Sequence, residues 1–363
     1  MRILAISSFD PASVILSHRD LMNAAGHDFR VAVVRAYTDR QRQADYVCEQ
    51  LNVRDTHVRP GVVRREASID PLMPNLDDLR AFAEKADVIQ FHPGIGQGNG
   101  DWASKSGSGT FPIHEFMAVE ERLKIADILS RRYRTVRRVA FFHGSVNTWT
   151  RMELYKTIFD AKPNAGATAW VRATSTLEYA VEFNAAYLPP LVSPPEVDGA
   201  PVLARLRGDD DPLVIAHTPT DRVACSTEVF LQAAQHAGAV TLLGEGKSHR
   251  DIWALKLQAH AGFDHLRGAF STNTLENAAV GLVPLFRLGY GDHDLMRDRF
   301  VRECECAPIR NLTSGMIPAK VLQDLSADPA YCRELQQHAH QWWKHYFSAE
   351  PITNRLVKFY GSL

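Results

Sequence analysis

One arginine in the second half of this 363-residue chain is placed where it could hold a phosphate. The apolar run at 213–217 is typical of a strand, and Arg222 lies in the polar turn that follows it. Arginine offers a planar fork of donors that matches phosphate oxygens. The same pattern also fits a solvated arginine in an ordinary turn, so Arg222 is a candidate that needs support from other residues.

A second polar segment leads into a short helix that carries Glu276. The sequence predicts a helix over 274–280, with Thr274 as its N-cap and Gly281 at its end. Free amides at a helix N-terminus bind anions, which makes those around Asn273 and Thr274 a candidate anion site. We place Glu276 in the first turn, where its carboxylate could accept hydrogen bonds from ribose hydroxyls; the alternative is a simple interaction with the helix dipole.

The elements that must position these residues alternate along the whole chain. Short apolar runs are separated by longer amphipathic segments, a pattern that indicates βαβ units and parallel sheets. Strands are predicted at 3–7, 29–34, 88–91, 139–143, 170–173, 213–217, 240–243, 265–267 and 283–286. Helices are predicted at 13–25, 76–85, 114–131, 226–237, 251–261, 274–280 and 318–325.

A proline-rich stretch at 188–201 divides this alternating pattern into two parts. Proline removes backbone donors and disfavours helix, so the stretch reads as a linker. The length of the chain also suits two domains. We therefore expect an α/β protein of two doubly wound halves, with ligands beyond the carboxyl ends of the strands. A cleft between such halves is a preferred position for a pocket.

The order of features in the second half resembles the donor-binding half of family 4-like glycosyltransferases. Their pattern L-E-A-M-A-x-G-x-P-V is similar to LENAAVGLVP at 275–284. The resemblance implies the GT-B fold, an α/β architecture with two Rossmann-like doubly wound domains facing across a cleft. It implies an acceptor-side domain at 1–195, a donor-binding domain at 196–345 and a helix at 346–363 that returns to the N-terminal domain.

The resemblance also implies roles for residues of the second half. Arg222 would contact the donor diphosphate and assist catalysis, and Glu276 would bind the nucleoside ribose. Amides around Asn273 and Thr274 would cap the distal phosphate, and the turn at Gly244 and Glu245 would lie near the base. Leu275 and Lys247 are the further donor-binding residues implied.

Two positions depart from the family pattern. The usual lysine three residues after the arginine is Cys225 here, which makes Lys247 or Lys256 a candidate for the missing cation. The first of the two family glutamates corresponds to Gly268, and Asp264 is the nearest upstream acid.

The first half carries looser resemblances. Residues 86–92 are similar to the family's D-[IV]-[IV]-x-x-H strand, and 140–145 to its H-G-[ST] turn. By this resemblance His143 would lie near the donor sugar, although a histidine at a strand end is as often structural. Asp10 either forms a turn or faces the cleft. The expected catalytic residues are His143, Asp10 and Arg222, and the expected acceptor-side residues are His92, Gly94, Gly96 and Ser145.

A glycine-rich segment at 94–110 follows a predicted strand. It does not run straight into a helix, which argues against a dinucleotide fingerprint. A mobile substrate-side loop or simple disorder fits it better. A second unusual stretch, 131–138, holds five arginines. They are either a solvated helix end or a patch for phosphates of a lipid headgroup or a nucleic acid.

The function implied is transfer of a sugar from a UDP- or GDP-sugar to a hydroxyl acceptor, with retention of configuration. We expect no tightly bound cofactor, and the chain has no Asp-x-Asp motif, so we predict metal-independent transfer and no metal ligands. The alternatives are a viral-type DNA glycosyltransferase acting on a modified base, a non-catalytic sugar-nucleotide-binding or glycan-binding protein, and a nucleotide-sugar epimerase.

Bulk composition narrows the partners. The formal net charge is −1, so no global charge favours nucleic acid or an acidic membrane. No apolar run reaches the roughly 18 residues of a membrane span, and the apolar start reads as a buried first strand. Five scattered cysteines fit a reducing compartment. We therefore expect a cytoplasmic protein; the acceptor and the oligomeric state stay open.

Overall fold

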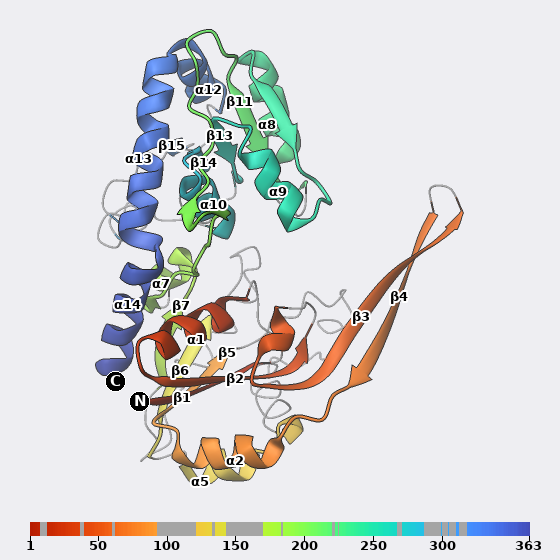
Figure 1. The fold of residues 1–363 in the computed structure, drawn as a ribbon, viewed down its shortest axis with the longest axis vertical. Helices are drawn as coiled ribbons and strands as arrows, with labels where there is room; N and C mark the ends of the chain where they lie inside the picture. The colour runs from red at the N-terminus through yellow and green to blue at the C-terminus, as the bar shows by residue number, and fades with distance from the viewer. Residues whose placement is uncertain are drawn as a thin grey trace. The chain divides into compact units, whose positions relative to one another are not determined.

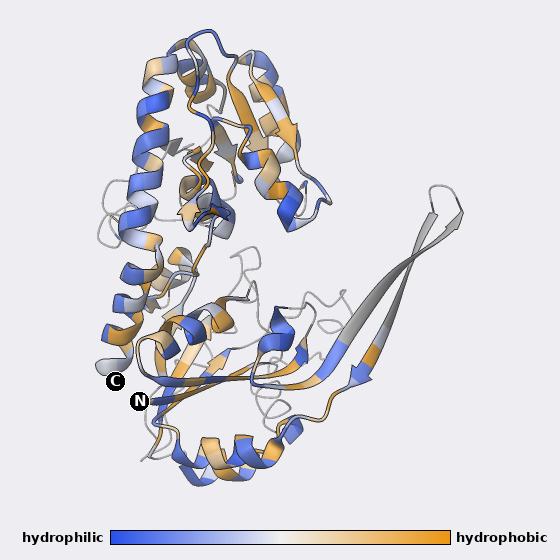
Figure 2. Ribbon diagram, viewed as in Figure 1, coloured by the Kyte–Doolittle hydropathy of each residue, from blue (hydrophilic) through white to orange (hydrophobic). Residues whose placement is uncertain are grey.

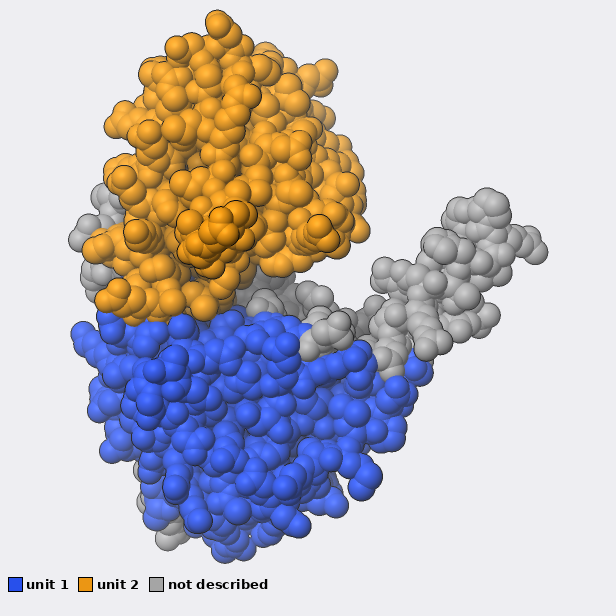
Figure 3. All heavy atoms as spheres, viewed as in Figure 1, with its two compact units in different colours: residues 1–175, 183–188, 353–363 blue, residues 176–182, 189–352 orange. Residues whose placement is uncertain are grey.

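The computed structural model describes residues 1–7, 13–36, 40–59, 62–92, 121–132, 135–142, 170–182, 184–219, 222–223, 225–266, 271–286, 299, 304, 310–311 and 318–363. The chain divides into two compact units, coloured separately in Figure 3. Unit 1 comprises Met1–Ser175, Phe183–Leu188 and Thr353–Leu363, and unit 2 comprises Thr176–Glu182 and Pro189–Ile352.

Unit 1 is built on an eight-stranded sheet with the order β4-β3-β2-β1-β5-β6-β7-β8. All of its strand pairs are parallel except β3 with β4. The strands are β1 (Arg2–Ser7), β2 (Asp28–Ala36), β3 (Tyr46–Arg59), β4 (Val62–Pro71), β5 (Val88–His92), β6 (Arg137–Phe142), β7 (Trp170–Thr174) and β8 (Ala186–Tyr187). Figure 1 shows β3 and β4 as a long two-stranded hairpin at the edge of this sheet.

Helices cover the sheet of unit 1. They are α1 (Val14–Ala24), α2 (Leu76–Lys85) and α5 (Ala126–Arg132), with a short 3-10 turn at Gln41–Gln43. Alternate residues of a strand point to opposite faces, and Leu4 and Ile6 accordingly join Phe82 of α2 and Ile128 of α5 in one buried cluster. Figure 2 shows the matching pattern, with apolar residues along the central strands and mixed faces on α2.

Unit 2 contains a five-stranded parallel sheet with the order β12-β11-β13-β14-β15. Its strands are β11 (Val214–His217), β12 (Val240–Leu243), β13 (Ala261–Phe263), β14 (Val283–Phe286) and β15 (Arg310–Asn311). The helices are α7 (Leu177–Glu182), α8 (Thr227–His236), α9 (His249–Lys256), α10 (Thr272–Ala279), α12 (Pro318–Ala327) and α13 (Pro329–Phe347). The proline-rich stretch at 188–201, which was predicted as a linker, contains a small hairpin of β9 (Glu196–Val197) and β10 (Ala200–Pro201).

The last helix, α14 (Ala349–Gly361), contributes residues to unit 1. Its Tyr360 is fully buried, donates a hydrogen bond of 2.5 Å to Gln90 Oε1 in β5, and packs edge-on against Phe29 of β2. Burial raises the pKa of the Tyr360 hydroxyl, which stays protonated and able to donate. Through Tyr360, helix α14 is therefore part of the core of unit 1.

Several elements differ from those expected. The strand predicted at 265–267 is wrong: the strand is Ala261–Phe263, whose small residues carry no β-branched signal. The hairpin β3–β4 and the 19-residue helix α13 were not predicted. The short elements α7, β8, β9, β10 and β15 were not predicted either. The other predicted strands lie within a few residues of described strands, and α2 has the predicted bounds.

Candidate functional site

Three candidate segments of unit 2 follow neighbouring parallel strands. Arg222 follows β11, Gly244 follows β12 and Asp264 follows β13. The register pairs His217, the last residue of β11, with Leu243 of β12 and Phe263 of β13. The three segments therefore leave the sheet at one edge, the carboxyl edge where ligands of such sheets bind.

Arg222 is held by two carboxylates. Its Nη2 lies 2.5 Å from Glu228 Oε1, and its Nη1 lies 2.9 Å from Glu245 Oε2. Its hydrogen bonds to Glu228 and Glu245 raise the pKa of the guanidinium, which carries its charge at any working pH. All three side chains are exposed, so both ion pairs are exchangeable contacts that an anionic ligand could replace.

Gly244 lets the turn after β12 approach the turn after β11. A Cβ at this position would lie 2.9 Å from Thr218 Cγ2 and 3.0 Å from Ile252 Cδ1. Such separations are shorter than side chains tolerate, so any larger residue would push the two turns apart. Gly244 is therefore a close-packing residue, whereas the neighbouring Glu245 reaches the surface and pairs with Arg222.

His217 fixes the start of α8. Its Nε2 lies 2.8 Å from Thr227 Oγ1, in the first residue of α8, and its Nδ1 lies 3.2 Å from the carbonyl of Phe263. Burial lowers the pKa of His217 to about 4, so the ring is neutral at neutral pH. With one N–H it donates to the carbonyl and accepts from the hydroxyl, so its role in this domain is structural.

The entry of α10 is organised by Asp264. This nearly buried carboxylate accepts hydrogen bonds from Ser271 Oγ, from Thr274 Oγ1 at 2.6 Å and from Asn273 Nδ2 at 3.3 Å. Ser271 is the N-cap, because its Oγ accepts from the amide of Asn273. The prediction of Thr274 as N-cap was wrong: Thr274 is the third helical residue and its hydroxyl bonds Asp264 instead.

Glu276 consequently lies in the second turn of α10 rather than the first. The helix ends as predicted at Gly281, whose φ of +78° is the left-handed conformation that glycine favours. Leu275, an expected donor contact, is buried with an exposed fraction of 1% and packs in the core.

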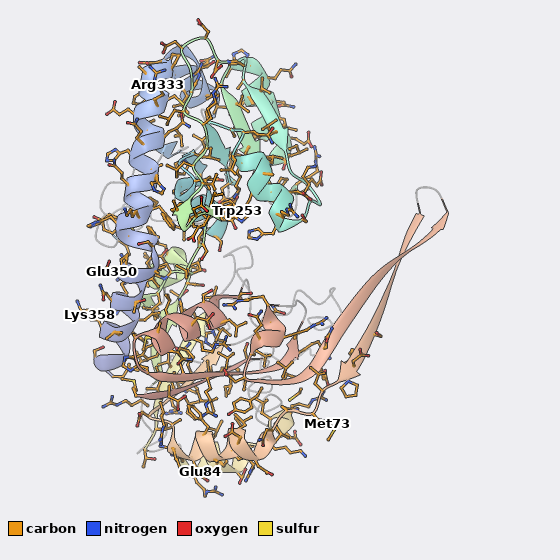
Figure 4. The ribbon with its side chains drawn as sticks, in the orientation of Figure 1. Met73, Glu84, Trp253, Arg333, Glu350 and Lys358 are labelled. Carbon is orange, nitrogen blue, oxygen red and sulfur yellow. The ribbon has the colours of Figure 1, made fainter. Side chains whose placement is uncertain are left out.

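The carboxylate of Glu276 sits between two bases of α9. Its Oε2 lies 2.5 Å from Lys256 Nζ, and its Oε1 lies 3.1 Å from His249 Nε2. Lys256 also donates to Asn273 Oδ1 at 2.7 Å, one turn before Glu276. Lys256 was a candidate for the missing diphosphate cation, but its side chain is fully buried and committed to Asn273 and Glu276. Figure 4 shows Trp253 of α9 among the side chains of this region.

Asn273 connects this cluster to the turn that carries Arg222. Its Oδ1 accepts a second hydrogen bond, of 3.1 Å, from Thr218 Oγ1 at the end of β11. Lys247, the other candidate cation, is exposed in the segment between β12 and α9. The structure thus brings Arg222, Gly244, Glu245, Asn273 and Glu276 to one edge of the sheet.

Sequence reasoning did not assign roles to His249, Trp253, Thr218 or Ser271, and it named Asp264 only as the nearest acid. A spacing signal for part of this cluster was present, since His249 and Trp253 are four residues apart on α9. Nothing in the sequence indicates that this face of α9 meets α10.

Only one of the residues expected on the acceptor side falls in the described ranges of unit 1. His92 is fully buried at the end of β5, where its ring stacks on Phe141 at 4.7 Å and its Nε2 lies 2.5 Å from Gln90 Nε2. The contacts of His92 are therefore those of a residue packed inside unit 1, and its place on the acceptor side stays a prediction. Asp10, Gly94, Gly96, His143 and Ser145 lie outside the described residues, as does most of the segment 94–110.

Three of the four arginines of 131–138 that the structure describes make contacts within unit 1, and the fourth, Arg137, is exposed. Arg131 pairs with Glu84 at 2.5 Å and with Asp127 at 3.2 Å. Arg132 donates to the carbonyl of Ala83. Arg138 is buried over the ring of Trp170, 4.9 Å from its centroid. These contacts favour the structural interpretation of the cluster over a phosphate-binding patch.

No helix in the described ranges has the length and apolar character needed to cross a membrane. No group of three or more His, Cys, Asp or Glu side chains in the same ranges is arranged to hold a metal ion.

No protein-family model matches the chain, and no curated protein matches its sequence. Solved structures do match. The HepE protein of Anabaena, solved in complex with UDP and glucose, is 10% identical with a TM-score of 0.60 over 100% of both chains. An O-GlcNAc transferase mutant of Thermobaculum terrenum is 13% identical with a TM-score of 0.51, over 99% of this chain and 66% of that one.

A lower similarity, with a TM-score of 0.45 and 11% identity over the full length of both chains, relates the protein to MurG of Acinetobacter baumannii. At these identities the likeness concerns the fold. It does not distinguish family 4 from other glycosyltransferases of the same architecture. Together with the largely parallel sheet of unit 1 and the parallel sheet of unit 2, the likeness to HepE shows that the chain has the GT-B fold of two Rossmann-like domains.

Proposed function

We propose that the protein is a glycosyltransferase that moves a sugar from a nucleoside-diphosphate sugar, a UDP- or GDP-sugar, to a hydroxyl acceptor. The observation that carries the proposal is the state of Glu276. Its charge is balanced from inside the domain by the buried Lys256, while exposed His249 alone among the described residues meets its other oxygen. A carboxylate held in this way is ready to accept hydrogen bonds from vicinal hydroxyls of a ribose.

Arg222 is the proposed diphosphate contact. A diphosphate would replace Glu228 and Glu245 at the guanidinium and would lie near the turn that Thr218 ties to Asn273. Negative charge grows on the leaving diphosphate during transfer, and a positioned cation stabilises it. With Arg222 and helix amides supplying positive charge, we propose metal-independent, retaining transfer in which the donor is attacked on the face of the leaving group.

His143 and Asp10 remain the proposed catalytic residues of the first half, on the resemblance of their segments alone. Gly94, Gly96 and Ser145 remain proposed acceptor-side residues on the same basis. Lys247 is the remaining candidate for the cation that family members carry at the position of Cys225. The proposal places the protein in the cytoplasm.

A panel of nucleotide sugars tests the proposal. Purified protein should bind one donor, which calorimetry measures. It should also slowly release the nucleoside diphosphate of that donor, which chromatography of the nucleotide measures. No binding and no release with any UDP- or GDP-sugar would refute it. If chelation of divalent metal ions abolishes release of the nucleoside diphosphate, the metal-independent step is contradicted. The assignment as a transferase would still stand.

The ribose contact has its own test. Glu276→Ala should weaken donor binding by about 1–3 kcal/mol, because the ribose hydroxyls lose a partly buried acceptor. Glu334→Ala, at an exposed position of α13, is the matched control and should leave affinity unchanged. Equal affinities in the wild type and Glu276→Ala would show that the carboxylate does not contact the donor.

One second candidate has an observation in its favour. Cys225 stands where family members place a lysine, and both described partners of Arg222 are acidic, which fits a protein that binds sugar nucleotides without turning them over. Binding without release of nucleoside diphosphate, with every acceptor class tried, would favour this alternative. The contacts of Arg131, Arg132 and Arg138 give no support to a DNA glycosyltransferase.

A further inference from the structure

The two oxygens of Glu276 have different surroundings. Oε2 faces Lys256, whose ammonium is buried, also bonds Asn273, and lies 5.3 Å from the centre of the Trp253 ring. Oε1 faces His249, whose side chain is 69% exposed. One contact is thus enclosed by the protein, and the other is formed by a residue at the surface.

The inner contact is too costly to break when a ligand binds. Withdrawing Lys256 would leave an unpaired charge inside the domain, and separating a buried pair is strongly unfavourable. The outer contact is weak, since ion pairs of exposed side chains contribute little. His249 is the first residue of α9, so its ring can turn into solvent without changing the helix behind it.

We propose that His249 covers Oε1 of Glu276 in the empty site and that the ribose of the donor must displace it, while Lys256 stays in place as a positioning residue. This inference rests on the function proposed above. It names His249 as the residue against which donor binding competes, and it predicts a specific loss of affinity in acid.

The sign of the pH effect follows from the groups around His249. Its hydrogen bond to Glu276 raises the pKa of His249, whereas partial burial and the charge of Lys256 act to lower it. Asp264, in turn, acts to raise the pKa of Lys256 and so favours its charged form. When the ribose takes Oε1, the imidazole loses its acceptor and its pKa falls towards the ordinary value. Donor binding then releases a proton, so affinity falls as the pH drops through the pKa of the free site.

Calorimetric titration with a nucleotide sugar that binds, such as UDP-glucose, tests the competition between about pH 5.5 and 8, the range in which histidines titrate. Both phosphates of such a donor are diesters and do not titrate there. The wild type should bind about two- to fivefold more weakly at the acid end, the factor that corresponds to an exposed ion pair. His249→Ala should bind with nearly constant affinity, whereas His236→Ala on α8 should keep the wild-type dependence.

Two further measurements separate the causes. A donor analogue without the ribose 2′ and 3′ hydroxyls should show little pH dependence in the wild type, because it does not displace His249. In the ligand-free protein, NMR titration of the His249 ring should show a lower pKa in Glu276→Gln than in the wild type. This second readout is independent of any donor.

The outcomes distinguish the two proposals. If no nucleotide sugar binds at any pH, the proposed function fails and this inference falls with it. If donors bind but His249→Ala keeps the wild-type pH dependence, the displacement is refuted and the function stands. An unchanged His249 titration in Glu276→Gln would likewise refute the contact from which the inference starts.

Discussion

At the scale of single residues, Asn277 shows a local cost built into the site. It follows Glu276 on α10, it is 1% exposed, and neither polar atom of its amide has a hydrogen-bond partner in the described part of the structure. Its side chain fills the space above Gly262 in β13, where a Cβ would overlap it. The chain thus pairs a large polar residue on α10 with a glycine on β13.

A double-mutant cycle on this pair should show strong coupling. Gly262→Ala alone should destabilise the protein by about 1–3 kcal/mol through overpacking. Asn277→Ala alone should be between neutral and ~1 kcal/mol stabilising, because loss of an unsatisfied amide offsets loss of contact. In the double variant the two methyl groups share the vacated space, and Gly262→Ala should cost little. Additive free energies of unfolding, measured with urea, would contradict this packing.

The phosphate assignment of Arg222 is tested with two ligands. Arg222→Ala should weaken binding of a nucleoside diphosphate about tenfold or more, since charge-assisted hydrogen bonds are lost, and should leave binding of the nucleoside alone almost unchanged. Glu228→Ala should act in the opposite direction, because it removes a competitor for the guanidinium. An equal loss for nucleoside diphosphate and nucleoside in Arg222→Ala would mean that Arg222 shapes the turn and contacts no phosphate.

Sequence reasoning brought forward Arg222, Gly244, Asn273 and Glu276, and the structure places all four at one edge of one sheet. Local pattern was sufficient here because each residue lies in the turn or helix entry that follows a recognisable strand. The contribution of Lys256 could not be found in this way. Its role depends on which face of α9 packs against α10, and this contact across twenty residues has no local signature.

At the scale of elements, α10 shows how much of a boundary depends on distant partners. Thr274 and Ser271 are both good N-caps by residue type. Asp264 decides between them, because it accepts the hydroxyls of both and draws Thr274 into the first turn. The strand β13 was misplaced for a related reason: Gly262 is suited to close approach of Asn277 rather than to strand propensity.

The N-cap of α10 gives a prediction at this scale. Ser271→Ala should cost about 1 kcal/mol of stability, the usual effect of removing a cap. It should also weaken nucleotide-sugar binding modestly, because Asn273 loses its anchor at the helix entry. Ser271→Asp would restore the cap to the amide but place a second carboxylate beside Asp264, and we expect it to recover neither property. Full recovery in Ser271→Asp, measured by thermal unfolding and calorimetry, would contradict the role given to Asp264.

At the scale of the whole molecule, the alternation of strands and helices was sufficient to predict two doubly wound halves. It did not predict the long hairpin β3–β4, the 19-residue helix α13 or the short elements α7, β8, β9, β10 and β15. The hairpin β3–β4 extends beyond its pairing with β2, because the last register pair of β2 and β3 is Ala36 with Gln50. The charged residues in its sequence interrupt the apolar run by which a strand is recognised.

The contribution of α14 to unit 1 gives the last prediction. Tyr360→Phe removes the hydroxyl that satisfies Gln90 in the middle of the sheet, next to His92. Leaving a buried amide oxygen without its donor should cost about 1–3 kcal/mol. Hydrogen exchange should therefore show lower protection of amides in β1, β5 and β6, the strands at the centre of that sheet. Amides of β11, β13 and β14 belong to the other unit and serve as the internal control; an equal loss of protection in both sets would mean that the two units unfold as one.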